Sequence, residues 1–106
     1  MRLLIVLMFL LISFSLCTQS TTQDVRQQAV SSCLKICKEA NISLENGPCL
    51  SDSNSEWDIT DWVCDVAHSP RQTVDNLLEN QCSAYRDGQA HHFVEVDPDC
   101  NFIRSV

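Results

Sequence analysis

Seven cysteines in a chain of 106 residues limit the fold more than any other feature of this sequence. One of them, Cys17, lies in an apolar leader, and the other six are Cys33, Cys37, Cys49, Cys64, Cys82 and Cys100. An even number of cysteines in a short exported chain predicts a disulfide framework. A zinc site is the competing interpretation, but the paired C-x₂-C spacings of zinc ligands are absent. We therefore predict three disulfides and no metal site.

The first 17 residues have the layout of a secretory signal peptide. Arg2 precedes an apolar run that, as a helix, would span roughly 22 Å against a hydrocarbon core of about 30 Å. Because Ser15 and Cys17 are small, we expect cleavage after Cys17, with cleavage after Ser20 as the alternative. Two other interpretations stay open, a lipid-modified Cys17 and an uncleaved anchor.

The predicted mature chain is short and acidic. Cleavage after Cys17 leaves 89 of the 106 residues and removes Arg2, so six Lys and Arg stand against 14 Asp and Glu, a net charge of −8. This charge disfavours nucleic acid and anionic membranes as partners. We expect a flexible lead-in over 18–22 and one domain over 23–106, too small for its core alone to give high stability.

One helix is predicted near the start of the mature chain. Its apolar residues recur at helical spacing: Val25, Ala29, Cys33, Ile36, Cys37 and Ala40. Asp24 suits the first turn through the helix dipole. We expect a helix from about Gln23 to Ala40 that buries this face.

Extended segments follow the helix. Residues 62–67 are rich in β-branched and aromatic residues, so we predict a central strand there, with Trp62 buried. Asp87-Gly88 lies between two runs, 82–86 and 90–96, which predicts a β-hairpin. Residues 100–104 suit a short last strand. The fold class is α+β, a disulfide-stabilised domain with one N-terminal helix packed on a short antiparallel sheet.

The connections carry turn signals and one modification motif. Residues 46–49 (Asn-Gly-Pro-Cys) and 97–99 (Asp-Pro-Asp) predict turns. Residues 69–81 show no clean period and suit one helical turn or an irregular packed loop. Asn41-Ile42-Ser43 is an N-glycosylation sequon, so Asn41 is a candidate glycosylation site.

The helix geometry restricts the disulfide pairing. Cys33 and Cys37 lie one turn apart on one helix face with nearly parallel Cα–Cβ directions, so they are expected to bond to different partners. Cys49 is the natural partner of one, because the turn at 46–49 sends the chain back over the helix end. Cys64 is the suggested partner of the other.

The sequence gives only weak indications of a metal site. His68, His91 and His92 are the histidines, and adjacent His91 and His92 point to opposite faces of a strand. The best metal hypothesis joins His68 with one of that pair, yet surface histidines explain the residues better. The run 97–101 opens like a calcium loop but has Phe102 where that loop needs glycine. We predict no tight metal site and no cofactor.

Four side chains are the candidates for contacting a ligand: Trp57, His68, Arg71 and His92. A tryptophan can stack on a ligand, and an arginine can anchor a carboxylate. For Arg71, an internal ion pair to Asp65 or Asp75 is the preferred interpretation. The cysteines are expected to be oxidised and therefore not nucleophiles, and G-x-S-x-G, H-E-x-x-H and phosphate-loop motifs are absent.

Four runs resemble small exported six-cysteine proteins of archaea, an uncharacterised family. They are Gly47-Pro-Cys-Leu50, Asp61-Trp-Val-Cys-Asp-Val-Ala-His-Ser-Pro-Arg-Gln72, Glu79-Asn-Gln-Cys82 and Ala90-His-His-Phe-Val-Glu-Val-Asp97. The resemblance covers about residues 30–103. It implies a shared cysteine framework and brings no activity or catalytic residue.

The function favoured by these features is a secreted or cell-surface, non-enzymatic binding module for an extracellular protein or glycan, with no membrane insertion after signal cleavage. One alternative is a small metal-dependent or hydrolytic enzyme that uses His68 and nearby carboxylates. Another is a structural component of a cell envelope.

Overall fold

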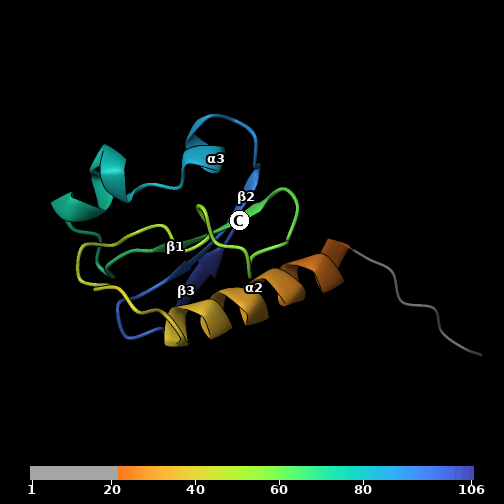
Figure 1. Cartoon of the computed structure of the whole chain (residues 1–106), viewed down its shortest axis with the longest axis horizontal. Helices are drawn as coiled ribbons and strands as arrows, with labels where there is room; N and C mark the ends of the chain where they lie inside the picture. The colour runs from red at the N-terminus through yellow and green to blue at the C-terminus, as the bar shows by residue number, and fades with distance from the viewer. Residues whose placement is uncertain (1–21) are drawn as a thin grey trace, which may run out of the picture.

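The computed structural model describes residues 22–106 as one long helix packed along a three-stranded sheet (Figure 1). The predicted signal peptide and nearly all of the lead-in lie outside the described residues. The elements, in chain order, are α2 (Thr22–Lys38), β1 (Trp62–Val66), the 3₁₀ turns η2 (Thr73–Asn76) and η3 (Leu78–Asn80), α3 (Ser83–Arg86), β2 (His92–Val96) and β3 (Phe102–Ser105). The α+β fold class is confirmed.

The predicted N-terminal helix is confirmed as α2, which ends at Lys38 rather than Ala40. Asp24 lies in its first turn and Lys35 and Lys38 in its last, so the charges favour the helix dipole at both ends. The residues of α2 that enter the core are Ala29, Cys33, Ile36 and Cys37, whereas Val25 is 40% exposed. The apolar face is therefore shorter than predicted.

The sheet is mixed rather than antiparallel, which corrects the prediction. Its order is β1-β2-β3, with β1 and β2 parallel and β2 and β3 antiparallel. The strand predicted over 62–67 exists as β1, over Trp62–Val66, but it lies at one end of this order rather than at its centre. Its outer side is covered by residues 48–50, because Leu50 N–H donates to the Cys64 carbonyl and Val66 N–H to the Pro48 carbonyl.

The predicted hairpin at 82–96 is wrong because residues 83–86 form the helical turn α3. The segment from Cys82 to Arg86 holds no β-branched residue, so its strand propensity is low. Asp87 and Gly88, where φ is +77°, end this turn rather than join two strands. The long connection then returns the chain to the start of β1, and β2 runs parallel to it.

The two faces of the sheet have different neighbours. Trp62, Cys64, Val66, Val94 and Val96 belong to the main core with the buried face of α2. Val63 and Phe93, which alternate with them, belong to a second cluster with Cys82, Ala84 and Ala90. Asp65 and Glu95 follow Val63 and Phe93 by two residues, so their side chains lie on this second face of the sheet. Burial of Trp62, at 5% exposed, is confirmed.

All six described cysteines are paired: Cys33–Cys64, Cys37–Cys100 and Cys49–Cys82. Cys33 and Cys37 have different partners, and Cys64 is one of them, both as predicted. The expected bond from Cys49 to the helix is wrong. Residues 48–50 run along the outer side of β1, so Cys49 reaches the second face of the sheet and bonds to Cys82 there. Three disulfides are typical of an oxidising environment.

The two predicted turns are confirmed. Gly47 has φ +66°, and Asp97 Oδ1 accepts the backbone N–H groups of Asp99 and Asn101 at 2.9 and 2.8 Å. Residues 69–81 form an irregular connection that contains the two short 3₁₀ turns η2 and η3, in agreement with the prediction of an irregular packed loop. Between residues 22 and 106, we find no helix with the length and apolar character needed to cross a membrane.

Candidate functional site

A cavity of about 470 Å³ lies on the side of the sheet away from α2. All three strands contribute to it, together with the connection between β1 and β2. Its lining residues are Asp65, Arg71, Gln81, Cys82, Tyr85, Arg86, Phe93, Glu95 and Arg104. The cavity therefore combines charged groups, a phenol ring, a phenyl ring and one end of a disulfide.

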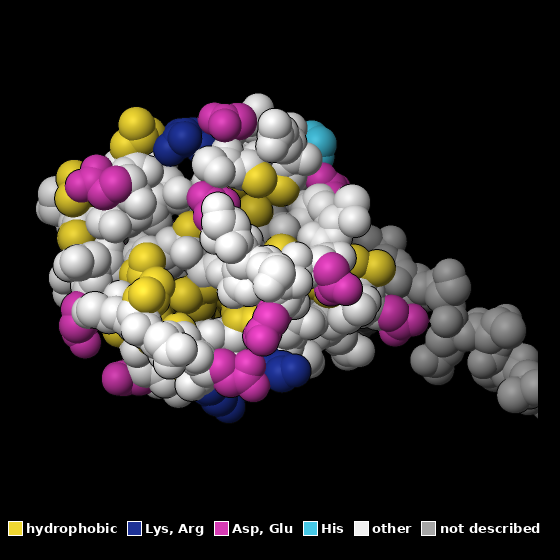
Figure 2. All heavy atoms as spheres, in the orientation of Figure 1, with side chains coloured by type: hydrophobic (Ala, Val, Ile, Leu, Met, Phe, Trp, Pro, Cys, Tyr) yellow, Lys and Arg dark blue, Asp and Glu magenta, His cyan; other side chains and the backbone are white. Residues whose placement is uncertain are grey.

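Positive charge is concentrated in this cavity. Residues 22–106 carry six Lys and Arg, and three of them, Arg71, Arg86 and Arg104, line it. Elsewhere acidic groups prevail; on the face drawn in Figure 2, acidic side chains are spread widely and basic ones lie only at the margins. A cationic cavity in an acidic protein is suited to attract an anionic group.

Glu95 is held between two of these arginines. Its side chain is buried, Oε2 accepts from Arg71 Nη1 at 2.8 Å, and Oε1 accepts from Arg104 Nε at 2.5 Å. Arg71 also donates to Asn76 Oδ1 and to the Asp75 carbonyl. The internal ion pair predicted for Arg71 exists, but its partner is Glu95 rather than Asp65 or Asp75.

Asp65 is directly opposite Glu95 in the β1–β2 register. Burial, reinforced by the negative charge of Glu95, raises the pKa of Asp65 to about 8, although Arg71 acts in the opposite direction. Asp65 Oδ1 is buried and has no hydrogen-bond partner. At neutral pH Asp65 is therefore mainly an uncharged acid that can donate a proton or a hydrogen bond into the cavity.

The remaining wall of the cavity is aromatic, and the guanidinium of Arg104 lies over part of it. Tyr85 and Phe93 meet edge to face with ring centroids 5.1 Å apart, and the Arg104 guanidinium lies 5.1 Å from the Phe93 ring centre. Among residues 22–106, the terminal nitrogens of Arg104 find no hydrogen-bond acceptor; only its Nε does. These N–H groups can bind an anion placed over the aromatic surface.

His68, a predicted site residue, is paired with Asp75. Its ring Nδ1 lies 2.9 Å from Asp75 Oδ1, and Asp75 also accepts the backbone N–H groups of His68 and Gln72. Burial alone would raise the pKa of Asp75, but these hydrogen bonds lower it. His68 and Arg71 line a second cavity, of about 360 Å³. The two residues are therefore close together.

The other two candidates lie elsewhere. His92 begins β2 and stacks on Trp62, with its Nε2 3.6 Å from Asp61, and His91 binds the same carboxylate at 2.6 Å. The hydrogen bond from His91 lowers the pKa of Asp61. Trp57 is half-buried and donates to the Trp62 carbonyl at 2.9 Å. Trp57 and His92 do not line either cavity near Arg71, so the four candidates form no single site.

Sequence reasoning missed Asp65, Glu95 and Arg104 as one site. Each is a charged residue inside a short strand, and Asp65 and Glu95 stand between apolar residues. Such a residue needs a polar partner on its own face of the sheet. This signal was available, but joining the three residues required the strand register.

Comparison with known proteins finds no counterpart of this chain: no family model, no curated protein and no solved structure matches it.

Proposed function

We propose that this chain is an exported, non-enzymatic binding module that holds a small organic anion in the cavity lined by Asp65, Arg71 and Arg104. The observation that supports it is the gathering of three of the six described cations around one cavity. Export is supported by the apolar leader and by the three disulfides.

The charges leave the cavity with an excess of donors. Two carboxyl groups, Asp65 and Glu95, line it, and the raised pKa of Asp65 leaves that carboxyl mainly uncharged at neutral pH. Three guanidiniums therefore outnumber the charged carboxyl groups of the lining. A carboxylate or phosphate group accepts bidentate hydrogen bonds from guanidinium, so it is the best match for this excess.

The aromatic wall defines the rest of the ligand. Tyr85 and Phe93 offer a surface on which a ring or a short apolar chain can pack while its acidic group reaches Arg86 and Arg104. A volume of about 470 Å³ accommodates a ligand of the size of an aromatic acid.

Calorimetric titration tests the proposal with phenylacetate and phenyl phosphate, against phenylacetamide as the uncharged counterpart. We expect the anions to bind and the amide to bind at least about tenfold more weakly. Arg86→Gln with Arg104→Gln should abolish anion binding. Lys35→Gln with Lys38→Gln removes the same charge from the last turn of α2 and should leave binding unchanged.

Equal loss in both double variants would show that net charge, rather than this cavity, attracts the anion. Equal binding of phenylacetate and phenylacetamide would overturn the anionic specificity.

A second candidate function, hydrolysis at His68, is favoured by one observation. A buried carboxylate that accepts from histidine Nδ1 orients the ring as in many general bases, and Asp75 does this for His68. Its test is turnover of nitrophenyl esters by the native chain and by His68→Gln. Loss of a measurable rate in that variant would favour hydrolysis over simple binding.

A further inference from the structure

The Cys49–Cys82 disulfide has surroundings unlike those of the other two. Cys82 lines the cavity of about 470 Å³, and Cys49 lines another of about 410 Å³. Cys33 and Cys64 are fully buried in the main core between α2 and the sheet, and Cys37 is 2% exposed. Its partner Cys100 is partly exposed, but it lines none of the three cavities described here. A small thiol therefore reaches Cys49–Cys82 more easily than the core disulfides.

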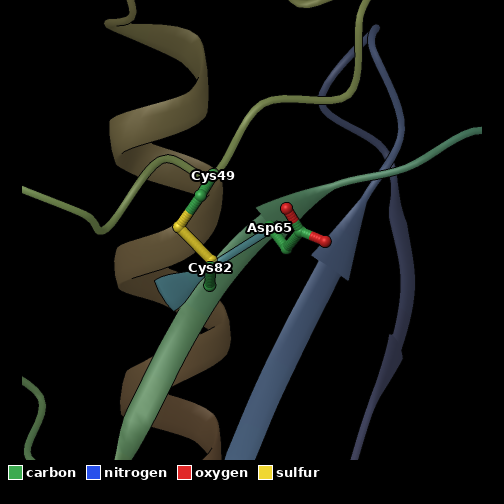
Figure 3. A group of neighbouring side chains, drawn as sticks. All are labelled: Cys49, Asp65 and Cys82. Atoms are coloured by element: carbon green, nitrogen blue, oxygen red, sulfur yellow. A yellow bond between two sulfur atoms is a disulfide. The ribbon is translucent and has the colours of Figure 1, made fainter. Parts of the chain in front are cut away.

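A carboxyl group lies beside this disulfide (Figure 3). Both sulfur atoms and one oxygen of Asp65 lie within 4.8 Å of one another, and an isolated β-bridge between Cys49 and Asp65 fixes this arrangement. The separation suits proton transfer through one water or after a small carboxyl rotation. Because the sulfurs are bonded to each other, they are not thiolate ligands for a metal.

Asp65 has a carboxyl oxygen available for this role. Its Oδ1 is the one buried side-chain polar atom in residues 22–106 without a hydrogen-bond partner. An uncompensated buried polar atom is costly, so its presence in the folded chain is not explained by packing.

We propose that Cys49–Cys82 is a redox-active disulfide that exchanges with small thiols, with Asp65 as the group that gives and takes the proton at Cys82. The proposal goes beyond ligand binding in the cavity and does not depend on it.

The exchange takes place in two steps. The thiolate of a reducing thiol attacks Sγ of Cys49, the more exposed residue of the pair, forming a mixed disulfide and breaking the bond to Cys82. The electron pair of that bond leaves on Cys82 Sγ, which takes the Asp65 proton. A second thiol of the reductant then displaces Cys49 as a thiol. The protein gains two electrons, the reductant leaves as a disulfide, and Asp65 regains its proton from solvent.

Several charged groups set the proton affinity of Asp65. Glu95 from β2 and Asp75 from η2 oppose its ionisation, and Arg71, from the segment before η2, favours it. The other titratable groups around the cavity are Tyr85 and Arg86 of α3 and Arg104 of β3. Burial nevertheless has the largest effect, so the pKa of Asp65 stays high enough for it to act as an acid at neutral pH.

The first experiment measures the reduction rate of each disulfide in the intact protein by dithiothreitol, using quench, alkylation and peptide mapping. We expect Cys49–Cys82 to react first, with the two core disulfides as internal controls. A glutathione adduct trapped on Cys49 would support the direction of attack. Reduction of all three bonds at the same rate would overturn the proposal.

The second experiment separates proton transfer from simple exposure, with Asp65→Asn as the test variant. We expect it to slow Cys49–Cys82 reduction by about tenfold at pH 6.5, below the usual contribution of a positioned acid because the leaving thiolate is a weak base. At each pH the reduction rate of the native chain is divided by that of the variant. This ratio is free of the effect of reductant ionisation, because both proteins meet the same reductant. It should fall toward one above pH 9, where native Asp65 is ionised.

Asp61→Asn is the matched control, since Asp61 pairs with His91 at the other end of β1 and an asparagine tolerates its positive φ. It should leave all three rates unchanged. A pH-independent ratio for Asp65→Asn would overturn the role of Asp65. Anion titration of the same variants keeps the two proposals separate, because none of the three disulfide reduction rates reports on ligand binding.

Discussion

At the scale of single residues, the cavity is defined by an unequal pair of carboxyl groups. Asp65 and Glu95 face each other across two strands, yet two arginines bind Glu95 and none binds Asp65. Burial first, and then the nearby charge of Glu95, raise the pKa of Asp65, so the unpaired group keeps its proton. One carboxyl thus holds the arginines in place, and the other is left as a neutral donor.

The Asp65 pKa has a consequence for stability. The pKa of Asp65 in the folded chain, about 8, lies above the ordinary aspartate pKa of 3.8, so the folded state binds more protons between these two pH values. Its contribution is therefore fully present below about pH 4 and is lost as the pH rises toward 8. Asp65→Asn should remove this loss, making the variant about 1–3 kcal/mol more stable than the native chain at pH 8.

Urea unfolding at pH 4 and pH 8 measures this difference, and subtraction of the two proteins cancels the other titrating groups. A native chain that is more stable than the variant at pH 8 would contradict the buried, unpaired state of Asp65.

Asp97 shows the opposite behaviour. Hydrogen bonds from the backbone, first that of Asn101, lower its pKa, so the stability it contributes is present above the unfolded pKa and is lost as the pH falls through the folded one. Asp97→Ala should cost about 1 kcal/mol at pH 7, and less in acid. Asp99→Ala is the control, because within residues 22–106 the Asp99 carboxylate accepts no hydrogen bond. Thermal unfolding at pH 7 and pH 2.5 compares them.

At the scale of elements, local patterns predicted α2 and β1 but not the path between the strands. The helix has a regular apolar face and favourable end charges, all within 17 residues. The hairpin prediction relied on Asp87-Gly88, a signal that also fits the end of a helical turn. Besides the low strand propensity of residues 82–86, distant contacts oppose a strand there: Cys82 bonds to Cys49, and Asp52 Oδ2 accepts the Ser83 N–H.

The candidate site was predictable only in part, because its residues are also brought together by contacts between distant parts of the sequence. Arg71 was recognised as a scarce cation with an internal partner, and its partner Glu95 lies 24 residues away. The Asp65–Glu95 contact follows from parallel pairing of β1 and β2, whereas the predicted antiparallel sheet gives another register. Charged residues inside strands mark the face of the sheet that carries the site, but they do not say which ones meet.

The turn before β1 offers a matched glycine test. A Cβ at Gly47 would lie 2.4 Å from Asp75 Oδ1 and 3.0 Å from the Val66 carbonyl, whereas one at Gly88 would meet nothing within 4 Å. Both glycines have positive φ, so each alanine costs about 1–2 kcal/mol from the backbone alone. Gly47→Ala should cost at least about 2 kcal/mol more than Gly88→Ala. Equal costs in urea unfolding would contradict the close approach of Asp75.

At the scale of the whole molecule, the leader and the disulfides point to the same compartment. We expect exported protein to begin at Thr18, because Ser15 and Cys17 suit signal peptidase. Intact mass of the secreted chain checks this, with Thr21 as the second choice. Retention of Met1 would contradict the predicted cleavage.

The disulfides divide the domain into a main core and a lighter second face, and two double variants can compare them. Cys33–Cys64 and Cys49–Cys82 close loops of similar length, with separations of 31 and 33 residues, so their chain-entropy contributions are nearly equal at roughly 4 kcal/mol. Cys33 and Cys64 are fully buried, whereas Cys49 is only partly so.

Replacing Cys33 and Cys64 by alanine should therefore cost more than replacing Cys49 and Cys82, by about 1–2 kcal/mol for the cavity left in the main core. Urea unfolding followed by fluorescence of buried Trp62 measures both variants against the native chain. Cys49→Ala with Cys82→Ala should keep the native fold, because α2 and the sheet remain joined by two disulfides. If the variant without Cys49 and Cys82 proves the less stable of the two, the second face of the sheet contributes more to the fold than its burial indicates. Reduction of an exchangeable disulfide on that face would then be incompatible with a stable protein.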